Sequence, residues 1–254
     1  MLLCIDVGNT QIVLATFDGA KLVHSWRMRT DARLTADELA LTFRGLLAAD
    51  SVDITGISAC STVPALHREL NVMLRRYYQD IPTLVVEPGV RTGVALNVDN
   101  PREVGTDRVV NTLAAYTLFG GPAIVVDFGT STNFDVVGRK GEFLGGALAP
   151  GIEISLDALA SRAAQLLKVP LVAPRGVIGK NTVEALQSGM LYGFAGQVDG
   201  IVTRIAAELG TPIPTVVATG GLAPLVVSES ATITHHEPAL TLIGLRLVYD
   251  RNSP

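Results

Sequence analysis

The aspartates Asp6 and Asp127 carry the clearest chemical signal in the sequence, because each heads a copy of the same short pattern. In both copies an apolar run ends in the acid, a glycine follows two residues later (Gly8 or Gly129), and a second apolar run returns. A buried strand that ends in a carboxylate places it at the edge of the sheet. Glycine lets the backbone approach a ligand, and nearby N–H and hydroxyl groups can bind phosphate oxygens. The pattern predicts two hairpins that hold phosphate and metal in a cleft between two related domains.

One Asp-x-Gly-x-Thr segment alone would indicate an ordinary β-turn, because Asp and Gly are frequent turn residues. The repetition in the same strand–turn–strand context, at Asp6 and again at Asp127, instead favours a functional pair. A turn follows the second run of each copy, at Asp18-Gly19 and at residues 138–141.

Asp107 and Arg108 stand side by side where a helix is expected to begin. The carboxylate could accept a hydroxyl proton, and the guanidinium could hold a carboxylate or spread phosphate charge, as phosphoryl transfer requires. The alternative is that Asp107 caps the helix and Arg108 lies on the surface. Position alone favours the capping interpretation.

Three glycine-rich segments could also contact ligands. Residues 145–151 lead from a strand into a helix and could bind an anion, and residues 218–221 could seat a nucleotide base or ribose. Residues 179–182 lack the glycine spacing of a Walker site, and Asn181 or Thr182 there is a good helix N-cap. Taken singly, each segment fits a structural turn at least as well.

The composition limits the class of protein. Of the 254 residues 48% are hydrophobic and 17% charged, which is ample for a core, and the net charge of −4 argues against a nucleic-acid binder. Cys4 and Cys60 lie in apolar runs and are expected to be small buried hydrophobes in a reducing compartment. We find no basic leader, no membrane-length apolar run and no metal-ligand spacing of histidines, so we expect a cytoplasmic protein without membrane contact.

The periodicity predicts two copies of an α/β plan, with the boundary at Gly120-Gly121-Pro122 and domains of residues 1–120 and 121–254. A capping box at Thr35–Glu38 opens one helix, and Pro64 lies in the first turn of another. Expected strands span 2–6, 11–17, 21–29, 54–60, 83–87, 123–127, 132–138, 142–148 and 214–218. Expected helices span 35–49, 63–78, 105–119, 152–167, 240–251 and 181–209, the last as two helices bent near Gly193 or Gly196.

The ordered set of motifs resembles the superfamily of actin, sugar kinases and heat-shock chaperones, and within it the type III pantothenate kinases. The resemblance covers nearly the whole chain, because the family's motifs appear in the expected order. They stand here as Asp6–Thr10, Asn100-Pro101, Gly105–Arg108, Asp127–Thr130, Gly145–Gly151, Gly179–Thr182 and Thr219–Gly221. The departures are Thr106, where the family often has Ala, residues 131–133, and Val98, where many members have a Tyr that contacts pantothenate.

The resemblance implies an α/β fold of two actin-like (ribonuclease H-like) domains, each a mixed β-sheet with flanking helices, and an ATP cleft between them. It implies the phosphorylation of pantothenate by ATP, the first step of coenzyme A biosynthesis, in a homodimer. Two alternatives stay open: a superfamily kinase for another small hydroxyl or carboxyl substrate, and a non-catalytic regulator on the same fold.

The resemblance also implies roles for single residues. Asp107 is the general base, Arg108 holds the pantothenate carboxylate or the transferring phosphoryl group, and Thr182 contacts pantothenate from the second protomer or domain. Asp6 holds Mg²⁺ through water, and Asp127 binds a monovalent cation, K⁺ or ammonium. The implied ATP-binding residues are Asp6, Val7, Gly8, Asn9, Thr10, Gln11, Ile12, Val13 and Thr130, and the implied substrate-binding residues are Gly105, Thr106, Asp107, Arg108 and Thr182.

Overall fold

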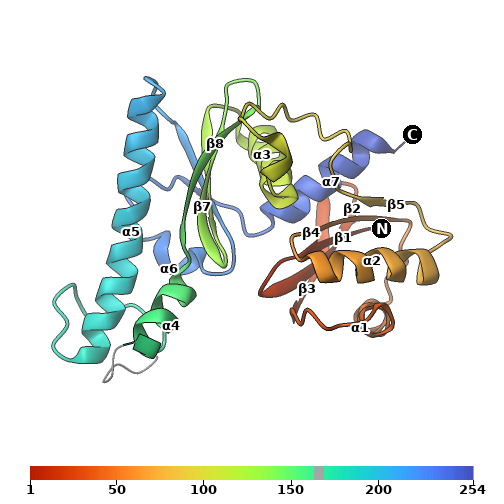
Figure 1. Ribbon diagram of the computed structural model, residues 1–254, viewed down its shortest axis with the longest axis horizontal. Coiled ribbons are helices and arrows are strands. Elements are labelled where there is room, and N and C mark those ends of the chain that lie inside the picture. Colours follow the sequence, from red (N-terminus) through yellow and green to blue (C-terminus); the bar gives the residue numbers. More distant parts are fainter. Residues whose placement is uncertain (163–168, 254) are drawn as a thin grey trace. The chain divides into compact units, whose positions relative to one another are not determined.

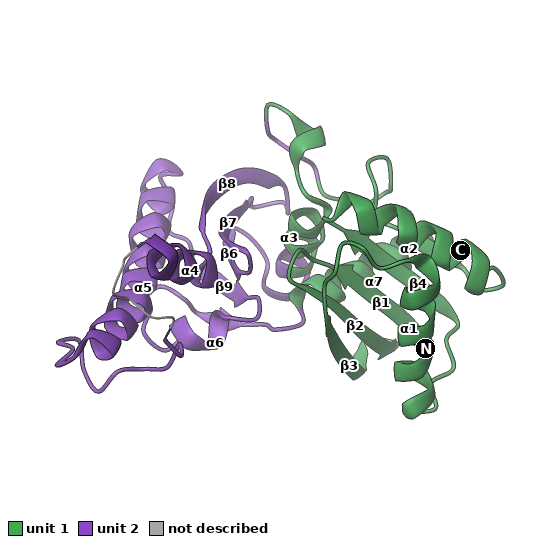
Figure 2. Ribbon diagram, turned by 60° about the horizontal axis from the view of Figure 1, so that its bottom comes forward, with its two compact units in different colours: residues 1–94, 99–114, 240–254 green, residues 95–98, 115–239 purple. Residues whose placement is uncertain are grey.

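The protein is described from a computed structural model, in which residues 1–162 and 169–253 are described. Its contacts divide the chain into two compact units (Figure 2). Unit 1 comprises residues 1–94, 99–114 and 240–254, and unit 2 comprises residues 95–98 and 115–239. This division differs from the expected single boundary at residues 120/121. Residues 95–98 and 115–120 belong to unit 2, and the C-terminal helix α7 (Leu240–Asn252) belongs to unit 1. The reason is burial, since Leu242, Leu245 and Val248 of α7 pack in an apolar cluster with the first sheet.

Unit 1 is built on a five-stranded mixed sheet in the order β3-β2-β1-β4-β5. The first three strands form the antiparallel meander expected from the sequence, and β4 and β5 add parallel to β1. The carboxyl ends of β1, β4 and β5 therefore meet at one edge of the sheet. The strands are β1 (Leu2–Val7), β2 (Gln11–Asp18), β3 (Lys21–Arg29), β4 (Gly56–Ser61) and β5 (Thr83–Val85).

The alternation of side chains along β1 separates the two faces of this sheet. Leu3, Ile5 and Val7 pack with α1 (Ala36–Ala49) and α2 (Pro64–Tyr77) on one face (Figure 1). Cys4 points to the opposite face, where α3 (Thr106–Phe119) and α7 complete a second apolar cluster. Asp6 has the same parity as Cys4, so its side chain emerges on the α3 side of the sheet.

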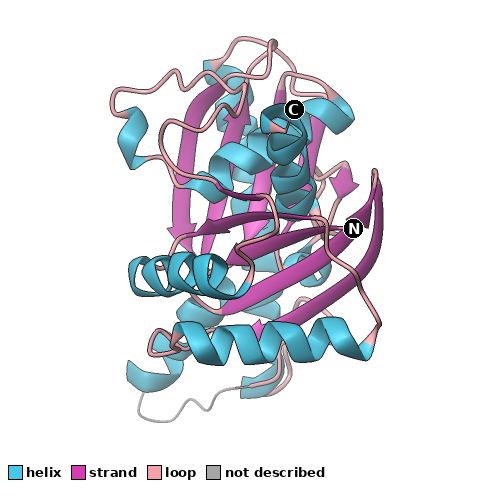
Figure 3. Ribbon diagram, turned by 90° about the vertical axis from the view of Figure 1, so that its right-hand side faces the viewer, coloured by secondary structure: helices cyan, strands magenta, loops and turns pink. Residues whose placement is uncertain are grey.

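Unit 2 repeats the strand order, as β8-β7-β6-β9-β10, with β6 to β8 antiparallel and β9 and β10 added parallel. Its core packs β6, β7 and β9 against α4, α5 and α6. Figure 3 shows the strands and helices in different colours. The elements are β6 (Ala123–Phe128), β7 (Ser131–Val137), β8 (Phe143–Pro150), α4 (Ile152–Arg162), α5 (Thr182–Glu208), β9 (Thr215–Thr219), α6 (Ala223–Val226) and β10 (His235–His236). The duplicated α/β plan predicted from the sequence is thus confirmed.

Local signals set several helix ends as predicted. Thr35 and Glu38 form the reciprocal capping box of α1, and Pro64 is in the first turn of α2. The expected bend near Gly193 or Gly196 is wrong, because α5 is one helix in which buried Phe194, Ala195 and Val198 hold the backbone against the core. The last residues of the helix expected at 152–167 lie outside the described residues. The short helix α6 and a 3₁₀ turn at Pro101–Glu103 were not predicted.

Within the described ranges, no helix is both long enough and apolar enough to cross a membrane.

Candidate active site

Asp6 lies near the carboxyl end of β1, and the hairpin loop that follows is held in a compact shape. Gly8 N–H donates to the Gln11 carbonyl at 3.0 Å, and a Cβ on Gly8 would stand only 3.1 Å from that oxygen. Thr30 fastens the loop from β3's end, its hydroxyl donating to the Gly8 carbonyl at 2.7 Å and its N–H to the Thr10 carbonyl at 3.0 Å. The loop residues themselves are exposed, as a phosphate-binding turn requires.

The Asp6 carboxyl has an altered acidity. Burial, followed by the negative charge of Asp107, raises its pKa from 3.8 to about 7, although a hydrogen bond from Cys60 acts in the opposite direction. The Cys60 thiol donates to Oδ1 of Asp6 at 3.4 Å. The carboxyl groups of Asp6 and Asp107 in unit 1 are therefore close enough for the charge of one to act on the other. Their positions in the sequence did not predict this proximity.

Asp107 lies in the first turn of α3, where its carboxylate accepts hydrogen bonds from the backbone N–H groups of Arg108 and of Asp107 itself. Burial raises the pKa of this carboxyl, and those bonds and the Arg108 charge partly offset the rise. The capping interpretation is thus correct as geometry, and the negative charge of the same carboxylate also contributes to the raised pKa of Asp6. Beside it, the Thr106 hydroxyl oxygen is buried and has no hydrogen-bond partner among the described residues.

Unit 2 presents its own acid at the equivalent strand end. Asp127 is near the end of β6, and the Gly129 N–H donates to the Ser131 carbonyl at 3.0 Å in the turn that follows. Gly220, at φ +90°, lies against this acid: a Cβ there would be 2.5 Å from Asp127 Oδ1 and 2.6 Å from the Phe128 carbonyl oxygen. Only glycine fits this place, because an added Cβ would clash with both oxygen atoms.

The other glycine-rich segment of unit 2 has a packing role. A Cβ on Gly146 would meet the Phe134 carbonyl oxygen, and one on Gly151 would meet the Thr130 carbonyl oxygen. The Gly151 N–H donates to that Thr130 carbonyl at 3.1 Å, which ties the start of α4 to the hairpin loop. Val98 lies beside this segment, its Cγ1 3.7 Å from the position of a Cβ on Gly145.

Thr182 is the exposed first residue of α5. Asn181 is the N-cap, as its carboxamide oxygen accepts from the Glu184 N–H at 2.9 Å, which confirms the capping prediction for this segment. Glu184 in turn accepts from the Lys180 N–H at 3.0 Å and pairs with Arg175. Thr182 therefore stands on a rigid helix start with its side chain available for a partner.

The described residues contain no cluster of three or more His, Cys, Asp or Glu side chains that could hold a metal by themselves. They do fit ions that are shared with a nucleotide. Mg²⁺ is commonly held by one or two carboxylates together with phosphate oxygens and waters, and the Asp6 carboxyl, whose pKa burial raises, is a candidate for such a site. Carbonyl oxygens suit K⁺, and Asp127 Oδ1 and the Phe128 carbonyl oxygen lie together beside Gly220, where they could contribute to such a site.

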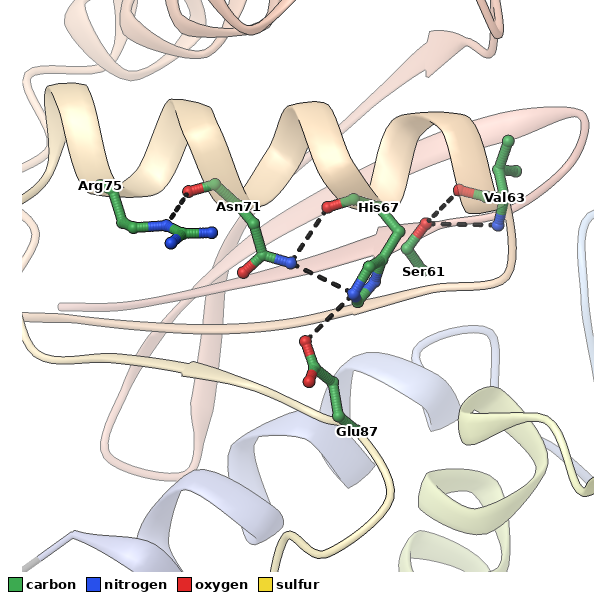
Figure 4. Close-up of polar contacts among 6 residues, drawn as sticks. All are labelled: Ser61, Val63, His67, Asn71, Arg75 and Glu87. Atoms are coloured by element: carbon green, nitrogen blue, oxygen red, sulfur yellow. Dashed lines mark hydrogen bonds and ion pairs between the residues drawn. The ribbon is translucent and has the colours of Figure 1, made fainter. Parts of the chain in front are cut away.

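Sequence reasoning missed two polar features of unit 1. It treated Cys60 as a mere hydrophobe, because nothing local reveals that β4 places it opposite Asp6. It also gave no role to His67, whose Nε2 lies 3.0 Å from Glu87 Oε1 and 3.1 Å from the Asn71 amide nitrogen (Figure 4). This contact ties the start of α2 to the segment after β5 at the carboxyl edge of the parallel strands.

Comparison with known proteins gives a consistent answer for the whole chain. A sequence model of the family described as type III pantothenate kinase matches residues 2–204. A protein of Salinispora arenicola named type III pantothenate kinase is 70% identical over 252 residues, covering 99% of this chain and 100% of that protein. One of Acidothermus cellulolyticus with the same name is 66% identical over 256 residues and covers 100% of both.

Solved structures show the same fold at low sequence identity. An inorganic polyphosphate/ATP-glucomannokinase from Arthrobacter sp. aligns with a TM-score of 0.53 and 14% identity, covering 99% of both chains. A ROK hexokinase from Thermus thermophilus aligns with a TM-score of 0.52 and 15% identity, covering 98% of both chains. These likenesses place the fold among two-domain sugar kinases, as the sequence predicted.

Proposed function

Because the chain belongs to the type III pantothenate kinase family, we propose that it transfers the γ-phosphoryl group of ATP to the hydroxyl of pantothenate. The product is 4′-phosphopantothenate, and the reaction is the first step of coenzyme A biosynthesis. The observation that carries this proposal beyond the family is the interacting carboxyl pair of Asp6 and Asp107, beside a turn built to approach phosphates. Phosphoryl transfer depends mainly on positioning and on charge neutralisation.

Asp107 is the general base. Its carboxylate accepts the proton of the pantothenate hydroxyl while that oxygen bonds to the γ-phosphorus and ADP leaves. Burial raises the pKa of Asp107, which makes the carboxylate a better proton acceptor, and the α3 amides hold it in one orientation. Arg108 follows on the same helix turn and binds the pantothenate carboxylate or the transferring phosphoryl group. Gly105 and Thr106 complete the pantothenate-binding segment.

Asp6 and the turn after it bind ATP. Gly8, Asn9 and Thr10 surround the phosphates with backbone groups, and the binding segment extends from Asp6 to Val13. When bound, Mg²⁺ neutralises charge on the phosphates, and Asp6 holds it through water. In unit 2, Thr130 contacts ATP from a loop that Gly151 fastens to α4.

Asp127 binds a monovalent cation, K⁺ or ammonium. The support for this role is that Asp127 Oδ1 and the Phe128 carbonyl oxygen lie together beside Gly220, and oxygen atoms of these kinds suit K⁺.

The protein acts as a cytoplasmic homodimer in which Thr182 of one protomer contacts pantothenate. Unit 2 exposes several large apolar side chains that an assembly of this kind would cover. Leu148 on β8 is 65% exposed, and Val177 and Ile178 before α5 are 66% and 76% exposed. Sedimentation of the wild type and of Ile178→Glu would decide this point: a wild-type monomer contradicts the dimer, and a variant monomer locates its interface.

A coupled assay of ADP release tests the function. We expect release that requires pantothenate and Mg²⁺ together, and that increases with K⁺ or ammonium. Turnover on a panel of sugars and small hydroxy acids at equal rates, without preference for pantothenate, would contradict the assignment.

A further inference from the structure

In unit 1, Cys60 contacts the acid Asp6, and neither the sequence nor the family match assigns a role to this contact. Strands β1 and β4 are parallel, with Asp6 and Cys60 as direct Cα partners, so both side chains emerge on the same face of the sheet. The thiol donates to Oδ1 of Asp6 at 3.4 Å. Cys60 is completely buried, and this contact aligns it with the acid that is proposed to face ATP.

We propose that Cys60 is a positioning residue for phosphoryl transfer, whose S–H group, through its contact with Oδ1, fixes the orientation in which Asp6 would serve the nucleotide and its cation. This inference rests on the proposed function of Asp6. Groups that hydrogen-bond to a metal-binding carboxylate fix its orientation, and their loss commonly weakens metal affinity or activity about 10- to 100-fold.

Burial limits what Cys60 can do. Its thiol is completely buried, and a buried structural cysteine is inert as a nucleophile but remains a weak hydrogen-bond donor. What remains for it is to pack and to donate one hydrogen bond to Asp6.

The internal duplication supports a selected arrangement. In unit 2 the acid Asp127 has Thr219 as its direct Cα partner on the neighbouring parallel strand β9. The two register positions are equivalent, since β1 and β4 of unit 1 correspond to β6 and β9 of unit 2 in the strand order. Each acid of the duplicated hairpin is thus paired in register with a residue whose side chain can donate a hydrogen bond, Cys60 in unit 1 and Thr219 in unit 2.

Cys4 provides a matched control within the same unit. It is also completely buried, and it belongs to the same apolar cluster as Cys60. It stands two residues before Asp6 on β1 and is the partner of Ser58, not of an acid. Cys4→Ala removes the same buried atoms as Cys60→Ala without touching Asp6.

The experiment compares Cys60→Ala, Cys60→Ser, Cys4→Ala and wild type. Steady-state kinetics give kcat and the KM for pantothenate, calorimetry gives ATP binding with and without Mg²⁺, and thermal unfolding gives the Tm without ligand. We expect Cys60→Ala to lower kcat about tenfold at unchanged pantothenate KM, because a thiol is a weak donor. It should weaken ATP binding in Mg²⁺ but not in its absence. Cys60→Ser, which keeps a donor, should recover most of both losses.

Cys4→Ala should lower the Tm as much as Cys60→Ala does, with wild-type kinetics and binding. Equal kinetics and binding for the two alanine variants would overturn the proposal, and so would a serine variant as impaired as Cys60→Ala. If wild type itself lacks pantothenate-dependent turnover, the proposed function fails, and calorimetry with Mg²⁺ and ATP still decides whether Cys60 positions Asp6.

Discussion

Unit 1 and unit 2 begin with the same hairpin and differ in what surrounds its acid. In unit 1 the turn between the paired residues Val7 and Ile12 holds residues 8–11, whereas in unit 2 the turn between Phe128 and Thr132 holds residues 129–131. The longer turn has exposed residues at its tip and is fastened by Thr30. The shorter one is fastened to α4 through Gly151.

The groups that surround Asp6 and Asp127 also differ. Asp6 faces a second carboxyl, that of Asp107, and its pKa is raised to about 7 by burial and by that neighbour. Asp127 faces the backbone of Gly220 and the Phe128 carbonyl oxygen. The duplication thus places an acid at the same strand end in each unit, and the groups around each acid give the two sites different properties. We expect a paired carboxyl site to suit a divalent ion with phosphates, and a single carboxylate among carbonyl oxygens to suit a monovalent ion.

The largest expected effect tests the second carboxyl of unit 1. Asp107→Asn keeps the shape of the side chain and removes the proton acceptor, so kcat should fall roughly 10²- to 10⁴-fold. The Tm should change little, because the variant also loses the cost of a buried charge. Single-turnover kinetics and thermal unfolding measure the two quantities. Near wild-type turnover would return Asp107 to a purely capping role.

The next effect tests the monovalent site of unit 2. Activity should rise steeply with K⁺ or ammonium and stay low in Na⁺, and Asp127→Ala should abolish that response. Gly220→Ala should lower the response more than about tenfold, since its Cβ would stand 2.5 Å from Asp127 Oδ1. Gly221→Ala is the control, because an added Cβ there meets nothing within 4 Å. If wild type turned over as fast with only a bulky organic cation as with K⁺, the proposed monovalent site would be contradicted.

The pH dependence of stability should have opposite signs in the two units. Folding raises the pKa of Asp6 from 3.8 to about 7, so the stability that this carboxyl contributes is complete below about pH 4 and is lost as the pH rises through 7. In metal-free and nucleotide-free protein, the Tm advantage of Asp6→Asn over wild type should therefore grow between about pH 4 and pH 7. Parallel Tm profiles of variant and wild type would show that burial does not raise the pKa of Asp6.

Asp199 in α5 provides the opposite case within unit 2. Burial alone would raise its pKa, but hydrogen bonds from Ser230, Ala231 and Thr232 lower it overall. A lowered pKa gives stability that is present above the unfolded-state value and lost as the pH falls through the folded value. Asp199→Asn should therefore cost about 1–2 kcal/mol at pH 7, and this cost should shrink toward pH 3. A cost independent of pH would assign the effect to packing.

The smallest expected effect concerns the hydroxyl beside the base. Thr106 Oγ1 is buried without a partner among the described residues. Removing an unsatisfied buried hydroxyl is neutral or stabilising by about 1 kcal/mol. Thr106→Val should therefore leave the ligand-free Tm unchanged or slightly higher. Asn181→Ala should lower the Tm, because loss of the N-cap of α5 costs about 1 kcal/mol of stability. A clear Tm loss in Thr106→Val would mean that a bound water satisfies the hydroxyl.

The sequence by itself determined the features that depend on near neighbours. Alternating apolar residues predicted the strands, the Thr35–Glu38 pair predicted the start of α1, and the repeated acid-x-glycine pattern predicted the duplicated hairpin. These signals are local, since strand alternation, capping and turn chemistry each act within a few residues. The ordered motifs also sufficed for the family, whose sequence model matches residues 2–204.

Only the tertiary structure decided which distant residues meet. Cys60 is 54 residues from Asp6, and its role follows from the parallel register of β1 and β4, for which no local pattern exists. In the same way α7 joins the first sheet from the far end of the chain, because a Cβ on Gly244 would meet the Val110 carbonyl oxygen where the two helices approach. Long-range burial, register and close backbone contact depend on the whole fold, so the sequence could predict the acids but not the groups that tune them.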